Sequence, residues 1–341
     1  MNTTFASDNF STVLPEVMTI LNEVNTGHQP SYGEDEYTEQ AVQLFKQHFG
    51  DDIDVCFFTT GTAANIFSLR LLLTRSYESV IVPNTAHTFG DEAGAPQAII
   101  GAQLLPVVTP DGKLRVEDLQ KEYDARLELE YHSTIPKVVS IAQSTEYGTM
   151  YTVEEVKAIA DWCHAHDMYL HMDGCRLPNA IVALDTDLLS ATRDAGVDVL
   201  CFGGAKNGLM NAEAVVIFNA PEQSLMRVQK QVLQLSSKMR YVSAQFIPYL
   251  TNDLWRKSAE HANAIAKQLA DELPGIEGIA LTQEIQTNQV FLSMPKALKD
   301  KLHAAGHMFY DWDTAKDEVR LATAWDNTTE DVEQFVRDAK S

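Results

Sequence analysis

The sequence predicts an α/β fold with a mostly parallel central sheet, followed by a smaller α+β domain. Two observations support this prediction. Over the first two-thirds of the chain, short β-like apolar runs alternate with segments of helical apolar spacing. Strands separated by helices imply parallel pairing, because parallel neighbours need a long crossover. Beyond that region, strand-like runs and two helical stretches form a second group. We therefore expect an N-terminal arm and large domain over 1–242, and a small domain over 243–341.

The large domain shows its elements clearly in order along the chain. Residues 34–50 have helical apolar spacing that ends at Gly50. A second helix is expected over 152–167, where Thr152 and Glu155 have the spacing of a capping box. The expected strands cover residues 54–60, 79–83, 103–107, 137–142, 168–174, 197–204 and 212–218, and a further helix covers 61–74.

The small domain follows a mostly helical stretch over 220–270. No glycine- and serine-rich linker separates the two domains, so we expect them to pack tightly. The expected strands cover residues 278–283, 288–294, 307–312 and 318–325, and the expected helices cover 295–305 and 328–339.

The composition limits the classes of function. The chain carries 26 Lys and Arg against 48 Asp and Glu, a net charge of −22, which argues against nucleic acid or an anionic membrane as the partner. The four cysteines are scattered without a CxxC pair, so reduced thiols are expected. The first residues lack the basic and apolar regions of a signal peptide, and no apolar run approaches the ~18 residues of a membrane helix. We expect a cytoplasmic protein.

The first chemical motif is FFTTGTAAN at 57–65. An expected strand runs into a Gly-Thr turn at Gly61 and Thr62 and then into a helix. Free N–H groups and a hydroxyl at a helix N-terminus can bind a phosphate or a carboxylate. The alternative is an ordinary strand-to-helix turn capped by Thr62.

The second motif is LHMDGCR at 170–176. Asp173 ends an expected strand, and ligands collect at the carboxyl ends of strands in open α/β sheets. A carboxylate there, followed by Gly174 and Arg176, can hold a pyridinium N–H. The alternative is an acid that turns the chain and an arginine in a surface ion pair.

The third motif is VDVLCFGGAKNGL at 197–209. Lys206 follows two glycines in a stretch that is almost free of charge. A partly desolvated lysine has the lowered pKa that a Schiff-base amine needs. Gly203, Gly204 and Gly208 let the backbone approach a bulky ligand. The alternative is a surface lysine in a flexible loop.

The three motifs occur in the order found in fold-type-I enzymes that use pyridoxal 5′-phosphate (PLP), which need a phosphate site, an acid and an amine. The chain resembles the threonine aldolase group of the β-eliminating lyase-like PLP enzymes, in particular the bacterial low-specificity L-threonine aldolases. The resemblance extends over nearly the whole chain, from FASDNFS to AWDNTTEDVEQF. Its most telling segments are GHQPSYGEDEYT, TTGTAANIFSLRLL, AHTFGDEAGAP, STEYGTMYTVEEVKAIA, HMDGCRLPNA, CFGGAKNG, LSSKMRYVSAQF and VRLATAWD.

This resemblance implies a PLP site with assigned residues. Lys206 would form the Schiff base, and Asp173 would keep the pyridine nitrogen protonated. Gly61 and Thr62 would hold the phosphate, and Arg176 would also lie at the cofactor. Two departures from relatives concern detail only. Ala205 stands where many relatives carry Thr or Ser, and Cys175 replaces the commoner Ala.

The resemblance also implies substrate and proton-transfer residues. His87 would lie over the ring face as a candidate proton acceptor, and His132 would lie near the substrate β-hydroxyl. Either histidine could instead be structural, and Arg320 could simply pair with an acid. The residues expected to bind the substrate are Ser7, Tyr32, Arg176 and Arg320, with Tyr32 reaching a site across a subunit interface.

Several further side chains have open roles. Glu92 could support the loop of His87, and Lys238 and Arg240 could contact phosphate or a neighbouring subunit. The histidines at 164, 166 and 171 lack the spacing of metal ligands, so we interpret them as structural and expect no metal site.

The implied reaction is retro-aldol cleavage of L-threonine or L-allo-threonine to glycine and an aldehyde by a homodimer or homotetramer with shared active sites. Three alternatives remain open. The same fold could catalyse β-elimination or act on bulkier aryl-serines, with pyruvate and ammonia as the signature of elimination. It could be a PLP aminotransferase, which would consume a 2-oxo acid. It could also be a non-catalytic binding protein with a degenerate site.

Overall fold

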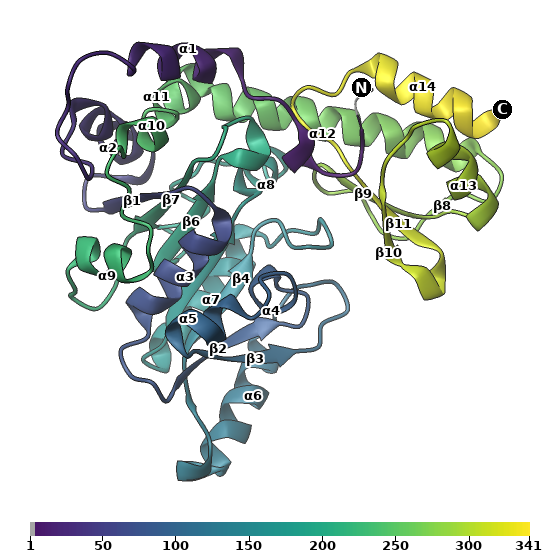
Figure 1. Ribbon diagram of the computed structural model, residues 1–341. Coiled ribbons are helices and arrows are strands. Elements are labelled where there is room, and N and C mark those ends of the chain that lie inside the picture. The colour runs from purple at the N-terminus through teal and green to yellow at the C-terminus, as the bar shows by residue number, and fades with distance from the viewer. Residues whose placement is uncertain (1–3) are drawn as a thin grey trace.

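The computed structural model describes residues 4–341 and contains two sheets in two lobes, as Figure 1 shows. The seven-stranded sheet has the order β1-β7-β6-β5-β4-β2-β3, and the four-stranded sheet has the order β10-β11-β9-β8. Their strands are β1 (Asp54–Phe58), β2 (Glu78–Pro83), β3 (Gln103–Val107), β4 (Ile135–Ala142), β5 (Tyr169–Gly174), β6 (Val199–Gly203), β7 (Glu213–Ile217), β8 (Ala280–Leu281), β9 (Gln289–Ser293), β10 (Tyr310–Asp313) and β11 (Glu318–Ala322).

The helices agree with the expected pattern of the large domain. The helix expected over 34–50 begins after Asp35, whose carboxylate accepts a hydrogen bond from the N–H of Thr38, and it ends at Gly50. Thr152 and Glu155 form the predicted capping box. The α-helices are α1 (Pro15–Glu23), α2 (Glu36–Phe49), α3 (Gly61–Leu72), α4 (His87–Gly90), α5 (Ala95–Ile100), α6 (Val116–Glu128), α7 (Val153–Ala165), α8 (Leu177–Ala183), α9 (Leu225–Gln231), α10 (Arg240–Ser243), α11 (Phe246–Leu250), α12 (Leu254–Glu272), α13 (Lys296–Ala304) and α14 (Thr329–Lys340).

Short 3-10 helices connect these elements. The two that matter for the site lie in the N-terminal arm and directly after β6. The 3-10 helices are η1 (Asp8–Phe10), η2 (Glu130–His132), η3 (Ala205–Asn207), η4 (Thr251–Asp253), η5 (Leu273–Gly275) and η6 (Thr314–Lys316).

Strand β7 is the antiparallel member of the mostly parallel sheet that the sequence predicts. Strands β2, β3, β4, β5 and β6 pair in parallel, but β7 is antiparallel to both β6 and β1. Only the segment 204–212 joins β6 to β7, which is too short for a parallel crossover. Because β7 opposes both neighbours, β1 runs in the same direction as β6. The carboxyl ends of β1, β2, β4, β5 and β6 therefore lie at one edge of the sheet.

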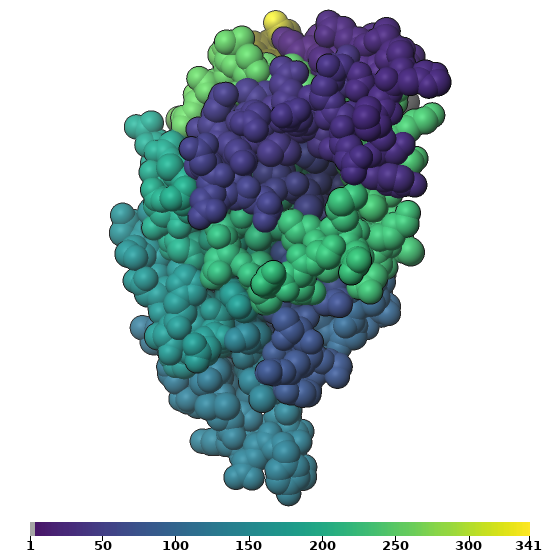
Figure 2. Space-filling model, turned by 90° about the vertical axis from the view of Figure 1, so that its left-hand side faces the viewer, coloured from purple at the N-terminus to yellow at the C-terminus, as the bar shows by residue number. Residues whose placement is uncertain are grey.

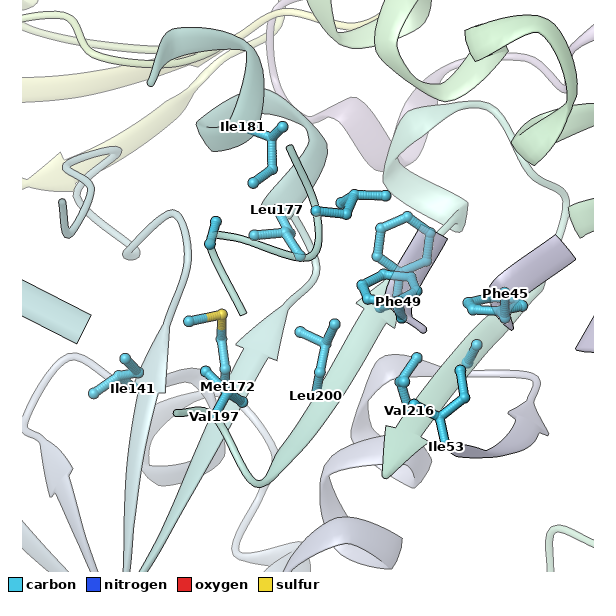
Figure 3. Packing of buried hydrophobic residues seen from close by; sticks show 14 of the residues in the cluster. Phe45, Phe49, Ile53, Ile141, Met172, Leu177, Ile181, Val197, Leu200 and Val216 are labelled. Carbon is cyan, nitrogen blue, oxygen red and sulfur yellow. The ribbon is translucent and has the colours of Figure 1, made fainter. Parts of the chain in front are cut away.

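Both faces of the large sheet are covered by helices. Side chains of β6 alternate between the two faces of the sheet. Leu200 and Phe202 belong to one buried cluster, and Cys201 belongs to another. Figure 3 shows Phe45 and Phe49 pointing from α2 onto the strands, and their rings lie 5.8 and 5.7 Å from that of Phe202. A fully buried phenylalanine contributes about 1.5–3 kcal/mol. This alternation fixes which residues face the helices and which strand ends reach the site.

A third buried cluster belongs to the small lobe. It contains Ile265 and Leu269 of α12, Val290 of β9 and Phe335 of α14, together with Phe5 of the N-terminal arm. The core of the large lobe continues as far as Trp255. Helix α12 thus contributes to both cores. The predicted domain boundary between residues 242 and 243 stays a prediction.

The N-terminal arm packs against the segment that follows β7. Figure 2 shows the two segments, purple and green, side by side on one face. The hydroxyl of Tyr241 donates to Asn25, and the N–H of Tyr32 donates to the carbonyl of Ser237. Among residues 4–341 no helix combines the length and the apolar character needed to cross a bilayer.

Candidate active site

The three motifs of the sequence meet at the carboxyl edge of the large sheet. Cys175, two residues after Asp173, packs against the glycines of the other two motifs. A Cβ atom placed on Gly61 would lie 3.1 Å from Cys175 Sγ, and one on Gly203 would lie 2.5 Å from Cys175 Cα. The second position therefore excludes any side chain. The turn before α3, the end of β5 and the end of β6 converge on one place.

Asp173 is a buried carboxylate with two fixed donors. Its Oδ2 accepts a hydrogen bond of 2.9 Å from Asn65 Nδ2, and its Oδ1 accepts one of 3.1 Å from the N–H of Cys175. Burial alone would raise the pKa of Asp173, but the charge of Lys206 and these hydrogen bonds lower it below its ordinary value. Asp173 is therefore held as an anion.

Lys206 lies in η3, immediately after β6, and is partly buried. Its ammonium group acts electrostatically on Asp8, His87, Asp173 and Glu213. It makes no hydrogen bond or ion pair with any residue between 4 and 341. The amine thus faces a group of acids without being paired to one of them.

Glu213 supports the turn that carries Lys206. It is the first residue of β7, opposite Phe58 of β1 and Gly203 of β6. Its Oε2 accepts a hydrogen bond of 3.0 Å from the N–H of Gly204. Burial raises the pKa of Glu213 to about 7, against the lowering effects of this hydrogen bond and of Lys206.

His87 begins α4, after the carboxyl end of β2. Its Nδ1 lies 3.0 Å from Glu92 Oε1, which also accepts a hydrogen bond of 3.0 Å from Asn65 Nδ2. Its backbone N–H donates to Glu146 Oε1 at 2.8 Å. The hydrogen bond to Glu92 raises the pKa of His87, although burial opposes it. Asn65 therefore links the acid at position 173 to the Glu92–His87 pair.

The N-terminus of α3 offers free backbone donors. Thr60, and not Thr62, is the N-cap, because its hydroxyl accepts the hydrogen bond from the N–H of Ala63. The alternative interpretation of Thr62 as the cap is therefore wrong. The N–H groups of Gly61 and Thr62 have no acceptor within 4–341. Free N–H groups at a helix start bind anions.

Arg176 forms a buried ion pair that the sequence did not predict. Its Nε and one Nη donate to Asp8 at 2.7 and 2.9 Å, and Asn288 Nδ2 also donates to Asp8 at 3.0 Å. Two of its nitrogens are therefore bound to Asp8, and its expected role at the substrate carboxylate and the cofactor stays a prediction. Ser7 lies beside this pair, where its hydroxyl accepts from the N–H of Asn9.

Arg320 is the less satisfied of the two arginines. Its Nε is buried without a hydrogen-bond partner in the described chain, and one Nη donates to the carbonyl of Ala6 at 3.4 Å. Its guanidinium lies over the rings of Tyr310 and Trp312, at 5.5 and 5.3 Å. Burial lowers the pKa of Arg320, and the charge of Arg176 lowers it further. Arg320 is a buried cation that lacks an anion.

His132 lies away from these groups. It ends η2, just before β4, and is exposed. The site lies beyond the other end of β4, and an eight-residue strand spans about 25 Å. Its expected place beside the substrate is therefore wrong for the site formed by a single chain.

The residues expected at a subunit interface lie on the face formed by the N-terminal arm. The ring of Tyr32 is 42% exposed, and Lys230 Nζ lies 5.1 Å from its centre. Lys238 is exposed, and the guanidinium of Arg240 lies over the ring of Tyr241 with its Nε unpartnered within the described residues. Their interface roles stay predictions.

The histidines interpreted as structural each have a protein partner. His164 lies 3.0 Å from Asp198, and His166 Nδ1 contacts the carbonyl of Trp162 at 2.7 Å. His171 is enclosed in the sheet, with Ser140 at 2.8 Å and a sulfur at 3.2 Å. The four cysteines are free thiols.

Four residues at the site were not assigned a role from the sequence: Asn65, Asp8, Glu146 and Glu213. Asp8 and Asn65 stand inside quoted motifs, but their partners lie 168 and 108 positions away. The position of Glu146 was visible in the sequence, because it follows an expected strand at its carboxyl end, as Asp173 does.

Comparisons with known proteins agree with this geometry. The sequence model of the β-eliminating lyase family matches residues 4–297. A low-specificity L-threonine aldolase of Pseudomonas aeruginosa is 38% identical over 338 residues, which cover 98% of this chain and 96% of that protein. Another, of a Pseudomonas species, is 37% identical over 339 residues and covers 99% and 97%.

Solved structures extend the comparison to the fold. A threonine aldolase of Leishmania major superposes with a TM-score of 0.94 and 29% identity over 99% of both chains. Mouse CSAD has a TM-score of 0.76 at 15% identity over 98% of this chain and 83% of that one, and shares the fold alone. The predicted fold class, a large α/β domain with a mostly parallel sheet and a smaller α+β domain, is confirmed.

Proposed function

Because this chain belongs to the β-eliminating lyase family, we propose that it is a PLP-dependent aldolase that cleaves L-threonine and L-allo-threonine to glycine and acetaldehyde. The single observation that carries the proposal is the pairing of a fixed anion, Asp173, with an unpaired amine, Lys206, at one strand edge. The two charges act on each other without forming an ion pair. An acid and an amine so arranged suit the two ends of one PLP ring.

The residues present fit this cofactor. The free N–H groups of Gly61 and Thr62 suit the phosphate, and the dipole of α3 favours an anion there. Lys206 would supply the amine for the aldehyde, and Asp173 would accept a hydrogen bond from the protonated ring nitrogen. Gly61 and Gly203 pack closely against the sulfur and the backbone of Cys175. When bound, PLP supplies an electron sink for the pair of electrons released at Cα.

The remaining side chains bind and orient the amino acid. Arg320, a buried cation without an anion, is the proposed ligand of the substrate carboxylate, with Ser7 beside it. Arg176 and Asp8 position the arm that carries Ser7. His87, which is hydrogen-bonded to Glu92, is the residue proposed to lie over the face of the cofactor ring.

The quaternary state and location are part of the same proposal. We expect a homodimer or homotetramer in which Tyr32 reaches a neighbouring active site, because its ring is exposed on the face of the N-terminal arm. Free thiols at all four cysteines agree with a cytoplasmic location.

The test is product analysis with purified protein. With L-threonine or L-allo-threonine, we expect equal amounts of glycine and acetaldehyde, together with the visible absorbance of bound PLP. Lys206→Ala should abolish both, whereas Lys157→Ala, at an exposed position on α7, should retain both. 2-Oxobutanoate and ammonia from these substrates would instead identify β-elimination, the alternative that the family name favours. Consumption of a 2-oxo acid would identify an aminotransferase.

A further inference from the structure

Glu146 is a buried carboxyl at the active site that has no role in the assignments above. It follows the carboxyl end of β4, where the N–H of Gln143 donates to the carbonyl of Asp173. Its Oε1 accepts the backbone N–H of His87 at 2.8 Å. Its Oε2 is shielded from solvent and has no partner among residues 4–341. One oxygen is thus anchored, and the other is enclosed by the protein without a hydrogen-bond partner.

The charged neighbours of Glu146 come from three elements. They are His87 of α4, Asp173 of β5 and Arg176 at the start of α8, and the charge of Glu146 also acts on the buried Tyr151. The only strong cation among them, Arg176, is already paired with Asp8. Burial raises the pKa of Glu146 to about 7, and the anion at Asp173 adds to that effect, while hydrogen bonds and His87 oppose it.

The other candidate proton acceptors are less suitable. His132 lies at the far end of β4 from this site. His87 has its Nδ1 bound to Glu92, which raises its pKa, so it keeps its proton to higher pH and is a weaker acceptor near neutrality. A carboxyl with both forms populated near pH 7 suits general base catalysis.

We propose that Glu146 accepts the β-hydroxyl proton of the substrate through its free Oε2, an inference that rests on the proposed aldolase function. The O–H bond breaks, and its electron pair becomes the second C–O bond of the aldehyde. The Cα–Cβ bond breaks, and its pair passes to the electron sink. A proton returned to Cα completes glycine, so the cycle takes up no net proton.

Glu146→Gln tests this role directly. The amide oxygen can still accept the His87 N–H, but the side chain cannot accept a proton. We expect kcat for threonine cleavage to fall about 10²–10⁴-fold, the usual contribution of a general base, with KM little changed. Exchange of the Cα hydrogen of glycine with deuterium needs no β-hydroxyl base, so its rate should be unchanged. Glu128→Gln, an exposed glutamate at the end of α6, is the matched control for both rates.

The pH dependence of the wild-type enzyme gives a second test that needs no variant. The ratio of the cleavage rate to the glycine exchange rate should be constant above about pH 7 and fall about tenfold per unit below it, because protonated Glu146 accepts no proton. Dividing by the exchange rate removes the titration of groups common to both reactions.

A third readout requires neither activity nor cofactor. In the protein freed of PLP, infrared difference spectra between about pH 6 and about pH 8 should show loss of a protonated carboxyl band. Part of that band should be absent in Glu146→Gln and present in Glu128→Gln.

The outcomes separate this inference from the aldolase proposal. If the wild type releases no glycine and acetaldehyde, the proposed function fails, whatever the variants do. If it does, the inference is overturned by full cleavage activity in Glu146→Gln, or by equal loss of cleavage and exchange, which marks a structural role. If that variant does not fold, a wild-type rate ratio that is flat with pH overturns the inference.

Discussion

The ion pair between Asp8 and Arg176 should affect stability strongly when one partner is replaced and the other is kept. Both side chains are buried, with 0% and 10% of their surface exposed, and two charge-assisted hydrogen bonds of 2.7 and 2.9 Å join them. Removing one partner leaves an uncompensated buried charge, which costs about 3–5 kcal/mol. Asp8→Ala and Arg176→Met should therefore each lower the free energy of unfolding by that amount. The double variant should be more stable than either single one, because no charge is stranded.

The assay is urea unfolding of the two single variants, the double variant and the wild type at one protein concentration, read as a double-mutant cycle. Burial raises the pKa of Asp8, but Arg176 lowers it below the ordinary value of 3.8. A carboxyl with a depressed folded pKa stabilises the fold above its unfolded pKa and loses that effect as pH falls through the folded one. The difference between wild type and Asp8→Ala should therefore be full at pH 7 and shrink below about pH 4. Additive losses, or a difference that grows in acid, would refute the pairing.

Three further predictions concern the site itself. Arg320→Met should raise KM for threonine about 10–150-fold, the equivalent of 1.5–3 kcal/mol for a lost bond to a carboxylate, as measured by initial rates. Asn65→Leu removes two hydrogen bonds to acidic side chains and should weaken PLP binding, which equilibrium dialysis would show; unchanged affinity would exclude a role for this amide. Gly203→Ala places a Cβ 2.5 Å from Cys175 Cα and should lower stability by about 1–3 kcal/mol, whereas Gly275→Ala, with nothing within 4 Å, should be neutral in thermal unfolding.

Sequence predicted the features that depend on local pattern. The strand that ends at Asp173 and the capping box at Thr152 need only residues that are neighbours along the chain. The antiparallel direction of β7 was also accessible, since the segment 204–212 is too short for a crossover. The prediction of a mostly parallel sheet did not say which strand is antiparallel, because this segment was not examined for its length.

The contacts that remained hidden join distant parts of the chain. Nothing in the spacing of Asp8 and Arg176 indicates that they form an ion pair across 168 positions. His132 shows a different kind of error, because resemblance placed it near the substrate while β4 sets it at the opposite edge. Applying the strand-end rule to this strand would have favoured Glu146, which follows its carboxyl end.

Four acids of the site divide by the direction in which their pKa values are shifted. Asp8 has Arg176, and Asp173 has Lys206 with two hydrogen-bond donors, so the pKa values of both are lowered and both stay charged. At Glu146 and Glu213 burial outweighs the lowering effects, which for Glu213 include the charge of Lys206, and raises their pKa values to about 7. Carboxyl groups whose surroundings give them different pKa values can serve different roles in one active site. As pH falls through 7, the acid that holds the cofactor should therefore stay charged while the proposed base is neutralised. PLP absorbance should persist at a pH where cleavage has already declined, and simultaneous loss of both would show that the two pairs of acids are not separated in this way.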